Sequence, residues 1–375
     1  MGGSIASITL NIPGTAAAVA SGFDGYPLNK LGEADKALSI ALLVSLIGGL
    51  FGLLFLALVG PILGNFALKF GSWEYFLLGI WGVTLVAALS MDSLLKGILS
   101  ACFGVLIAMV GIDPFTGIIR YTFGLDQLTG GINDVACMIG LFGMKEVFTQ
   151  LGNKNAFKFT NKRYKLRELL PDWKIMKRCW PCLTWSAPIG AIIGLLPGAG
   201  GNIGALVSYG VTKSVTKKPS RPFGQGAYEG VAAPEVANDS AVGGALTTIF
   251  TLGVPGDAPT AVILSAFYMH GLRPGPAFLL TNRHYFQLIL IFLAIGVVAS
   301  YLIGILGSNA MLKMLQLPRW ILLPFITMLC FVGSYSLSNN LYDVMLMLIF
   351  GLIGYVMEST GFPITPCILA VILNP

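Results

Sequence analysis

The chain has 375 residues, of which 55% are hydrophobic and only 11% are charged, and its mean hydropathy is +0.80. A soluble domain carries about 25% charged residues, so this composition excludes an ordinary soluble protein and predicts an all-α polytopic membrane protein. The net charge of +6 does not indicate nucleic-acid binding, because the basic residues lie in short loops between apolar segments.

Apolar segments of membrane-spanning length follow one another along the chain, at roughly 20 residues for each crossing. They are 37–60, 74–90, 94–112, 134–149, 285–308, 319–337 and 341–358. Two further regions, 182–212 and 230–271, are apolar but interrupted by proline and glycine. Basic residues flank 182–212 on both sides, which favours a re-entrant hairpin with Pro197 at its tip; a crossing segment is the alternative.

The segment 150–181 is the clearest topological marker, because its lysines and arginines far outnumber its acidic residues. By the positive-inside rule this segment is cytoplasmic. The sequence therefore predicts a first transmembrane repeat over 1–149, a basic cytoplasmic linker over 150–181, and a second transmembrane repeat over 182–375.

An internal repeat supports this division. Placing Pro13-Gly14 on Pro255-Gly256 also aligns identical residues on both sides of the pair: Gly2 with Gly244, Thr9 with Thr251, Leu10 with Leu252 and Ala16 with Ala258. A turn over 24–27 and a later one over 270–274 are predicted on opposite sides of the membrane. The two repeats are therefore predicted to be inverted, as in many secondary transporters.

Proline-glycine pairs interrupt three apolar segments, at Pro13-Gly14, Pro197-Gly198 and Pro255-Gly256. Proline removes a backbone donor and glycine tolerates unusual backbone angles, so each pair predicts a broken helix. Broken backbone at bilayer depth survives only where protein covers it or where it lines a wet cavity. Corresponding breaks in two halves of a transporter indicate its binding site.

Half-helix N-termini offer free backbone N–H groups and a partial positive charge, which suit a carboxylate. For any one break, the alternative is a kinked helix packed by glycines. For Asp257, the alternative to substrate binding is the role of N-cap of its half-helix. The predicted substrate-binding residues are Asn11, Pro13, Gly14, Thr15, Pro197, Gly198, Gly200, Gly201, Asn202, Ser208, Pro255, Gly256, Asp257 and Thr260.

A coupling cation prefers carboxylates and unwound carbonyls. Glu235 and Asn238 are three residues apart in a stretch of small residues and are predicted to face one cavity that binds Na⁺ or H⁺; no other cofactor and no metal is expected. The alternative reading makes 224–240 a surface loop or helix start, with Asp239 and Ser240 as its cap.

Membrane proteases need a zinc motif, paired aspartates or a serine near a histidine. The chain has no H-E-x-x-H and only two histidines, so we expect no enzyme activity. Cys179 and Cys182 form a C-x-x-C outside any βαβ context, which favours packing over a redox or metal role.

Several stretches together resemble the large membrane subunit of the tripartite tricarboxylate transporters, the TctA-like family. They occur in order along nearly the whole chain: Gly2-Gly3-Ser4, Asn11 to Thr15, Asp24 to Pro27, Leu196 to Gly201, Ser208 to Gly210, Phe223 to Gly226, Glu229 to Glu235, Leu252 to Gly256 and Gly271 to Pro276. Family members have further apolar segments before the position of Met1 and after Pro375. The resemblance therefore predicts a chain truncated at both ends, with both repeats incomplete.

The resemblance implies a multi-pass protein of the bacterial inner membrane. It also implies ion-coupled symport of tri- or dicarboxylates, together with a small membrane subunit and a periplasmic solute-binding protein. A channel-like protein or an inactive membrane scaffold is the alternative function.

Overall fold

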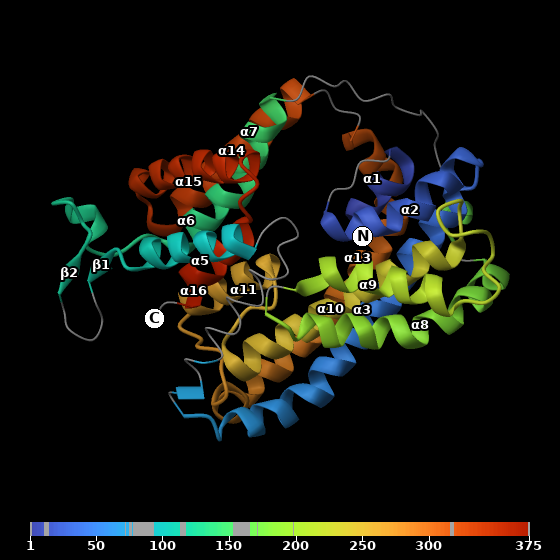
Figure 1. The fold of residues 1–375 in the computed structure, drawn as a ribbon, viewed down its shortest axis with the longest axis horizontal. Helices are drawn as coiled ribbons and strands as arrows, with labels where there is room; N and C mark the ends of the chain where they lie inside the picture. The colour runs from blue at the N-terminus through green and yellow to red at the C-terminus, as the bar shows by residue number, and fades with distance from the viewer. Residues whose placement is uncertain are drawn as a thin grey trace. The chain divides into compact units, whose positions relative to one another are not determined.

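The computed structural model describes residues 2–10, 15–71, 73–74, 77, 94–112, 118–152, 166–170, 172–197, 199–315 and 319–373. These residues are almost entirely helical, which confirms the all-α prediction (Figure 1). The helices are α1 (Gly2–Leu10), α2 (Ala16–Lys30), α3 (Ala34–Ala67), α5 (Leu94–Ala108), α6 (Asp134–Met138), α7 (Lys145–Gly152), α8 (Trp173–Gly194), α9 (Gly200–Val215), α10 (Tyr228–Leu252), α11 (Ala258–Met269), α12 (Phe278–Thr281), α13 (Arg283–Leu315), α14 (Arg319–Ser338), α15 (Leu341–Ser359) and α16 (Ile364–Leu373). Short elements are the strands β1 (Gly111–Ile112) and β2 (Ile119–Arg120), the 3₁₀ turns Asp126–Leu128 and Leu166–Leu169, and a π-helical stretch Ile139–Met144.

The chain packs into two compact units, each built from separate stretches of sequence. Unit 1 comprises Met1–Lys69, Phe157–Asp257 and Pro274–Gln316, and unit 2 comprises Phe70–Ala156, Ala258–Arg273 and Leu317–Pro375. These units reflect packing, whereas the predicted repeats reflect sequence order and membrane topology. The repeat boundaries at 149 and 182 therefore stay a prediction.

In unit 1, α10 is the central helix and packs against α3, α8 and α9. Close approach depends on glycine. On α3, a Cβ atom at Gly48 would lie 2.5 Å from the carbonyl oxygen of Val236, and one at Gly52 would lie 2.9 Å from that of Ser240. The i, i+4 spacing of Gly48 and Gly52 is the small-residue pattern that lets membrane helices approach backbone to backbone.

The opposite side of α10 is covered in the same way. Gly190 and Gly194 of α8 lie against the backbone of Ala237 and Ala241, with no room for a Cβ atom on either glycine. Because small residues surround it, α10 is buried along nearly its whole length. The stretch of small residues around Glu235 and Asn238 is therefore a helix-packing surface.

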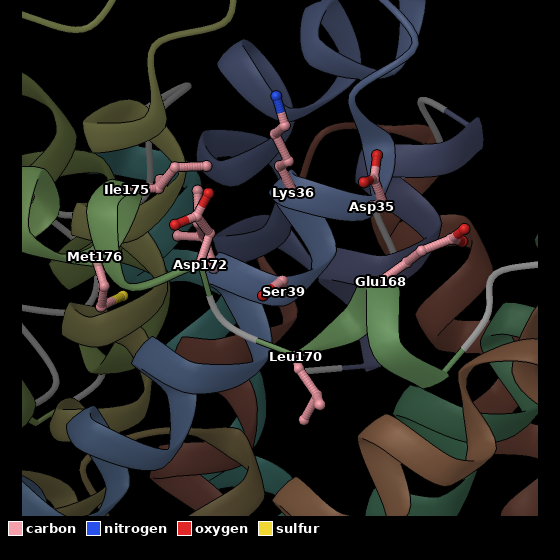
Figure 2. A pocket seen from close by; sticks show the side chains of 9 residues that line it. Asp35, Lys36, Ser39, Glu168, Leu170, Asp172, Ile175 and Met176 are labelled. Atoms are coloured by element: carbon pink, nitrogen blue, oxygen red, sulfur yellow. The ribbon is translucent and has the colours of Figure 1, made fainter.

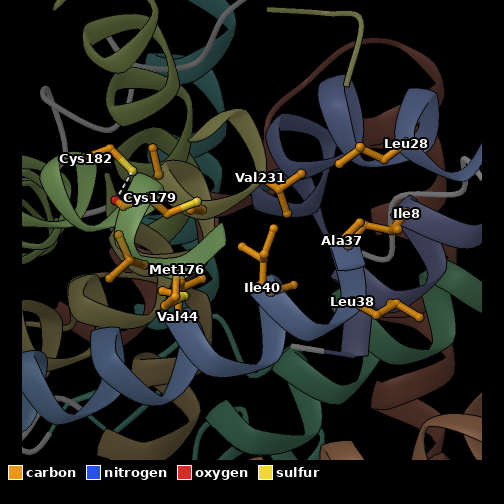
Figure 3. Packing of buried hydrophobic residues seen from close by; sticks show 14 of the residues in the cluster. Ile8, Leu28, Ala37, Leu38, Ile40, Val44, Met176, Cys179, Cys182 and Val231 are labelled. Atoms are coloured by element: carbon orange, nitrogen blue, oxygen red, sulfur yellow. Dashed lines mark hydrogen bonds between the residues drawn. The ribbon is translucent and has the colours of Figure 1, made fainter. Parts of the chain in front are cut away.

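A buried apolar cluster joins α1, α2, α3, α8 and α10 in unit 1 (Figure 3). Cys179 and Cys182 belong to this cluster as free thiols, and the Cys182 Sγ donates to the Cys179 carbonyl at 2.9 Å. Their contacts are therefore those of small hydrophobic residues, as the packing interpretation predicted. Both residues lie in α8, which begins at Trp173.

Unit 2 has its own packing. The π-helical stretch Ile139–Met144 lies between α6 and α7 and packs against α15, where Gly140 contacts the backbone of Met347. Gly104 of α5 lies directly on the backbone of Cys367 in α16. Two-residue strands β1 and β2 pair antiparallel. A buried core cluster forms where α14 and α15 meet α7 and the π-helical stretch.

Three helices within the described residues are long and apolar enough to cross a membrane: Ala34–Ala67, Arg283–Ala310 and Leu341–Ser359. They coincide with predicted segments. The segment 94–112 is a shorter apolar helix, Leu94–Ala108, and 74–90 lies largely outside the described residues. Of the interrupted regions, 182–212 forms the two helices α8 and α9 around Pro197, and 230–271 forms α10 and α11 around Pro255.

Two local predictions are wrong. Residues 24–27 are not a turn but lie inside α2, because Asp24 is buried and its carboxylate accepts hydrogen bonds from another segment. Asp239 and Ser240 are not a helix cap, since both lie in the middle of α10. The surface-loop reading of 224–240 fails beyond Ala227, where α10 begins with its small residues buried against α3 and α8.

Candidate functional site

The first and third breaks have matching helix boundaries. With Pro13 placed on Pro255, the end of α1 at Leu10 falls on the end of α10 at Leu252. The start of α2 at Ala16 likewise falls on the start of α11 at Ala258. Both inner helix ends therefore agree with the repeat alignment, and Asp257 directly precedes α11. The inverted orientation of the repeats stays a prediction.

The second break joins α8 to α9 and meets the third break within unit 1. Gly200, the first residue of α9, has φ of +52°, a conformation that favours glycine. The side chain of Asp257 lies against it, since a Cβ atom at Gly200 would be 2.5 Å from the Cβ of Asp257. Gly256 is packed equally closely, because a Cβ atom there would lie 2.7 Å from the carbonyl oxygen of Gly194.

The first break meets the second through Asn202. The Asn202 Oδ1 accepts a hydrogen bond from the backbone N–H of Ala17 at 3.1 Å, and Thr15 accepts one from Ala18 at 3.3 Å. A side chain from the first turn of α9 thus caps the first turn of α2. The three breaks therefore converge in unit 1, as the site prediction requires, and α2 and α9 pack side by side.

The remaining predicted substrate residues divide into three groups. Pro197, Gly201 and Pro255 are buried at the meeting point of the second and third breaks. Ser208 is fully buried and its hydroxyl donates to the Ala233 carbonyl at 2.9 Å, so it fastens α9 to α10. Thr260 belongs to unit 2, in the first turn of α11. Asn11, Pro13, Gly14 and Gly198 lie outside the described residues.

Asn238 and Glu235 do not face the same surroundings. The Oδ1 atom of Asn238 lies directly against Gly201 at the start of α9. Glu235 is 1% exposed and its carboxylate accepts hydrogen bonds from three serine hydroxyls, each on a different helix. Ser4 of α1 and Ser21 of α2 donate to Oε2 at 2.6 and 2.9 Å, and Ser45 of α3 donates to Oε1 at 2.9 Å. Asn238 therefore belongs with the helix breaks, and Glu235 with α1, α2 and α3.

Asp24 is a structural residue that the sequence interpretation missed. Its Oδ1 accepts backbone N–H groups of Gly224, Gly226 and Ala227 at 2.8 to 2.9 Å, and its Oδ2 accepts the Tyr209 hydroxyl at 2.9 Å. Gly224 and Gly226 have φ of +83° and +100°, which turns successive N–H groups toward one carboxylate. Asp24 thereby anchors the loop before α10 to α2. The Gly-x-Gly spacing was the available sequence signal.

A network of charged and polar side chains surrounds Glu33, which directly precedes α3. Glu33 accepts from Arg221 and Tyr228 at 2.8 Å each and from Lys36 at 3.1 Å. The hydrogen bond from Arg221 contributes most, and with Tyr228 and Lys36 it lowers the pKa of Glu33 from 4.5 to about 2 against an opposing effect of burial. The loop 216–227 between α9 and α10 is thus held to the start of α3 by the ion pair between Arg221 and Glu33.

A pocket of about 200 Å³ lies beside this network (Figure 2). Its wall carries the carboxyl groups of Asp35, Glu168 and Asp172, with Lys36 at its side. An acidic wall repels a carboxylate, so this pocket does not suit an organic anion. Among the described residues, no group of three or more His, Cys, Asp or Glu side chains is arranged to hold a metal ion.

The sequence matches one protein-family model, described as the tripartite tricarboxylate transporter TctA family, over residues 1–369. Two similar proteins come from Agrobacterium vitis. An uncharacterized 52.8 kDa protein in the TAR-I ttuC′ 3′ region is 33% identical over 374 residues, which cover the whole chain and 74% of that relative. An uncharacterized protein in the TAR-II ttuC′ 3′ region is 34% identical over 186 residues, half of this chain and 76% of that relative. No solved structure matches. The family match over residues 1–369 does not bear out the predicted truncation.

Proposed function

The chain belongs to the tripartite tricarboxylate transporter TctA family, and we propose that it is the large membrane subunit of a secondary, ion-coupled carrier for tri- and dicarboxylates. We propose that it works with a small membrane subunit and a periplasmic solute-binding protein in the bacterial inner membrane. The observation that carries this proposal is the convergence of three helix breaks around the first turn of α9. The family match and this arrangement of helix breaks favour a transporter over an enzyme.

The chemistry of this meeting point suits a carboxylate. The start of α9 presents backbone N–H groups and the positive end of its helix dipole. Glycines at 200 and 201 leave that backbone uncovered by side chains of their own. The amide oxygen of Asn202 is used by Ala17, so its exposed side chain offers the NH₂ group to a ligand. The Oδ1 atom of Asn238 lies against the same turn, and its NH₂ group is a second candidate donor.

Asp257 has a different role in this proposal from the one that sequence suggested. Its carboxylate carries the same charge as the substrate, yet its side chain lies against Gly200 at the start of α9. Its negative charge would oppose direct contact with a substrate carboxylate. We therefore assign Asp257 to shaping the first turn of α9 and not to direct contact with an anion.

Uptake by reconstituted proteoliposomes tests the proposal. The full chain is incorporated with the small membrane subunit, supplied with the solute-binding protein, and assayed with radiolabelled tri- and dicarboxylates under Na⁺ and pH gradients. We expect saturable uptake that requires a cation gradient, and an Asn202→Ala variant with at least tenfold lower kcat/KM. Ser214→Ala, on an exposed position of the same helix, is the matched control and should transport normally.

The outcomes separate the alternatives. Uptake that never saturates and ignores ion gradients would identify a channel. No uptake of any carboxylate by the complete assembly would refute the carrier function and favour an inactive scaffold. Equal activity of Asn202→Ala and Ser214→Ala would leave a carrier but remove the first turn of α9 from its substrate site.

A further inference from the structure

Glu235 and Asp239 are separated by one turn of α10, so their side chains share a face of that helix. The Ser45 hydroxyl, which donates to Glu235 at 2.9 Å, also lies near the Asp239 carboxyl group. Ser4 and Ser21 also donate to Glu235. The result is a group of oxygen atoms that four helices, α1, α2, α3 and α10, bring to one place inside unit 1.

The second observation concerns Asp239 alone. Its Oδ2 atom is buried and has no hydrogen-bond partner within the described part of the chain. A buried carboxylate oxygen without a donor is costly, because water has been removed and nothing replaces it. Glu235, by contrast, already accepts hydrogen bonds on both of its oxygens. Asp239 therefore supplies an available ligand atom beside an organised set of oxygens.

Asp239 is reached from a cavity of about 310 Å³ between α3, α10 and α13. Ser45 and Asp239 form part of its polar lining together with Ser300, while most of its wall is apolar. A water molecule occupies about 30 Å³ in the liquid, so the cavity has room for several waters beside its polar side. The cavity therefore has room for a small hydrated ion beside Asp239.

We propose that Asp239, Glu235 and the hydroxyl of Ser45 bind the small monovalent cation that drives transport, with Na⁺ as the ion. This inference rests on the proposed carrier function and changes the ion site expected from sequence by placing Asp239, and not Asn238, beside Glu235. A cation between two carboxylates one turn apart is attracted to both of them. Carboxylate and hydroxyl oxygens are hard ligands, which suit alkali cations better than soft metals.

Direct Na⁺ binding and Na⁺-dependent uptake test this site in the full-length protein. Binding is measured as the rise in thermal unfolding midpoint when NaCl replaces choline chloride at constant ionic strength. We expect Asp239→Asn to abolish this rise and to increase the Na⁺ concentration for half-maximal uptake at least tenfold. Ser45→Ala should weaken both effects in the same direction.

Two control variants make the test specific. Asp343→Asn in unit 2 removes another buried carboxylate whose Oδ2 has no partner among the described residues, and it should keep the Na⁺ response. Asn238→Ala should lower substrate affinity while the Na⁺-dependent stabilisation stays unchanged. If Asp239→Asn does not fold, Ser45→Ala still decides the matter, since an undiminished Na⁺ response in that variant would overturn the proposal.

The remaining outcomes distinguish this inference from the carrier function. Na⁺ stabilisation that requires Asp239, in a protein without carboxylate uptake, would support the ion site and refute the carrier. Carboxylate uptake driven by a pH gradient, with no Na⁺ stabilisation, would support the carrier and overturn the Na⁺ site. An Asp239→Asn protein with the wild-type Na⁺ response would overturn it as well.

Discussion

Removing the Asp24 carboxylate should destabilise unit 1 more than any single hydrogen bond would suggest. An Asp24→Ala substitution leaves three backbone N–H groups without their acceptor, and two of these, on Gly226 and Ala227, are buried. An unsatisfied buried N–H costs roughly 1–3 kcal/mol, whereas water replaces the acceptor at the exposed Gly224. We therefore expect a loss of about 4 kcal/mol. At about 2–4 °C for each kcal/mol, the unfolding midpoint should fall by roughly 8–16 °C.

Two conservative variants should lower the stability by smaller amounts. Asp24→Asn keeps an acceptor oxygen and should cost about 1–2 kcal/mol, the difference between charge-assisted and neutral hydrogen bonds. Tyr209→Phe removes one hydrogen bond to Oδ2 and should cost about 1 kcal/mol. Thermal unfolding of the detergent-purified protein gives all three values, and hydrogen exchange at residues 223–227 locates the change. An Asp24→Ala protein as stable as wild type, with unchanged exchange in this loop, would refute the reasoning.

Two further predictions concern the helix break and the charge network. Gly200→Ala should reduce uptake at least tenfold, because φ of +52° costs a residue with a Cβ about 1–2 kcal/mol and the Asp257 side chain occupies the space that the new Cβ would need. Gly210→Ala is the control and should transport normally, because nothing lies within 4 Å of a Cβ at that position. The lowered pKa of Glu33 means that its ion pair stabilises the folded protein above pH 4.5 and that this contribution is lost as the pH falls toward 2. Because Glu33 is partly exposed, the ion pair contributes about 1 kcal/mol. In Arg221→Ala, the stability measured between pH 5 and pH 3 should no longer show this acid-dependent loss. A pH profile equal to that of the wild type would contradict the assignment.

The helix breaks were predictable from sequence because proline and glycine act on their own backbone. Pro197 and Pro255 each end an apolar helix, and the structure places a new helix a few residues later in both cases. The repeat alignment places Leu10 on Leu252, and the structure ends a helix at each of them. Local covalent geometry depends only on neighbouring residues, so these features need no knowledge of tertiary contacts.

Contacts between distant segments were not predictable in the same way. The sequence indicates that Asn238 and Asp239 lie near Glu235, yet it does not say which helix each side chain meets. Asn238 turns toward Gly201, and Asp239 turns toward Ser45 and the adjoining cavity. Asp24 was read as part of a turn because its acceptor role depends on a loop that begins some 200 residues later along the chain. Such outcomes are decided by packing, which a single sequence does not specify residue by residue.

The packing of α10 gives a physical reason for coupling between the two proposed sites. Asn238 and Asp239 are adjacent residues of one buried helix, so a rigid shift of α10 moves both of them together. Its contacts with α3 and α8 include the close approach of Gly48 and Gly190 to backbone atoms. If a cation at the proposed Asp239 site favours one position of the helix, that position also fixes Asn238 relative to the first turn of α9. Differential binding of the ion to two positions of α10 is then sufficient to change the affinity for substrate, and reciprocity requires the substrate to change the affinity for the ion by the same factor.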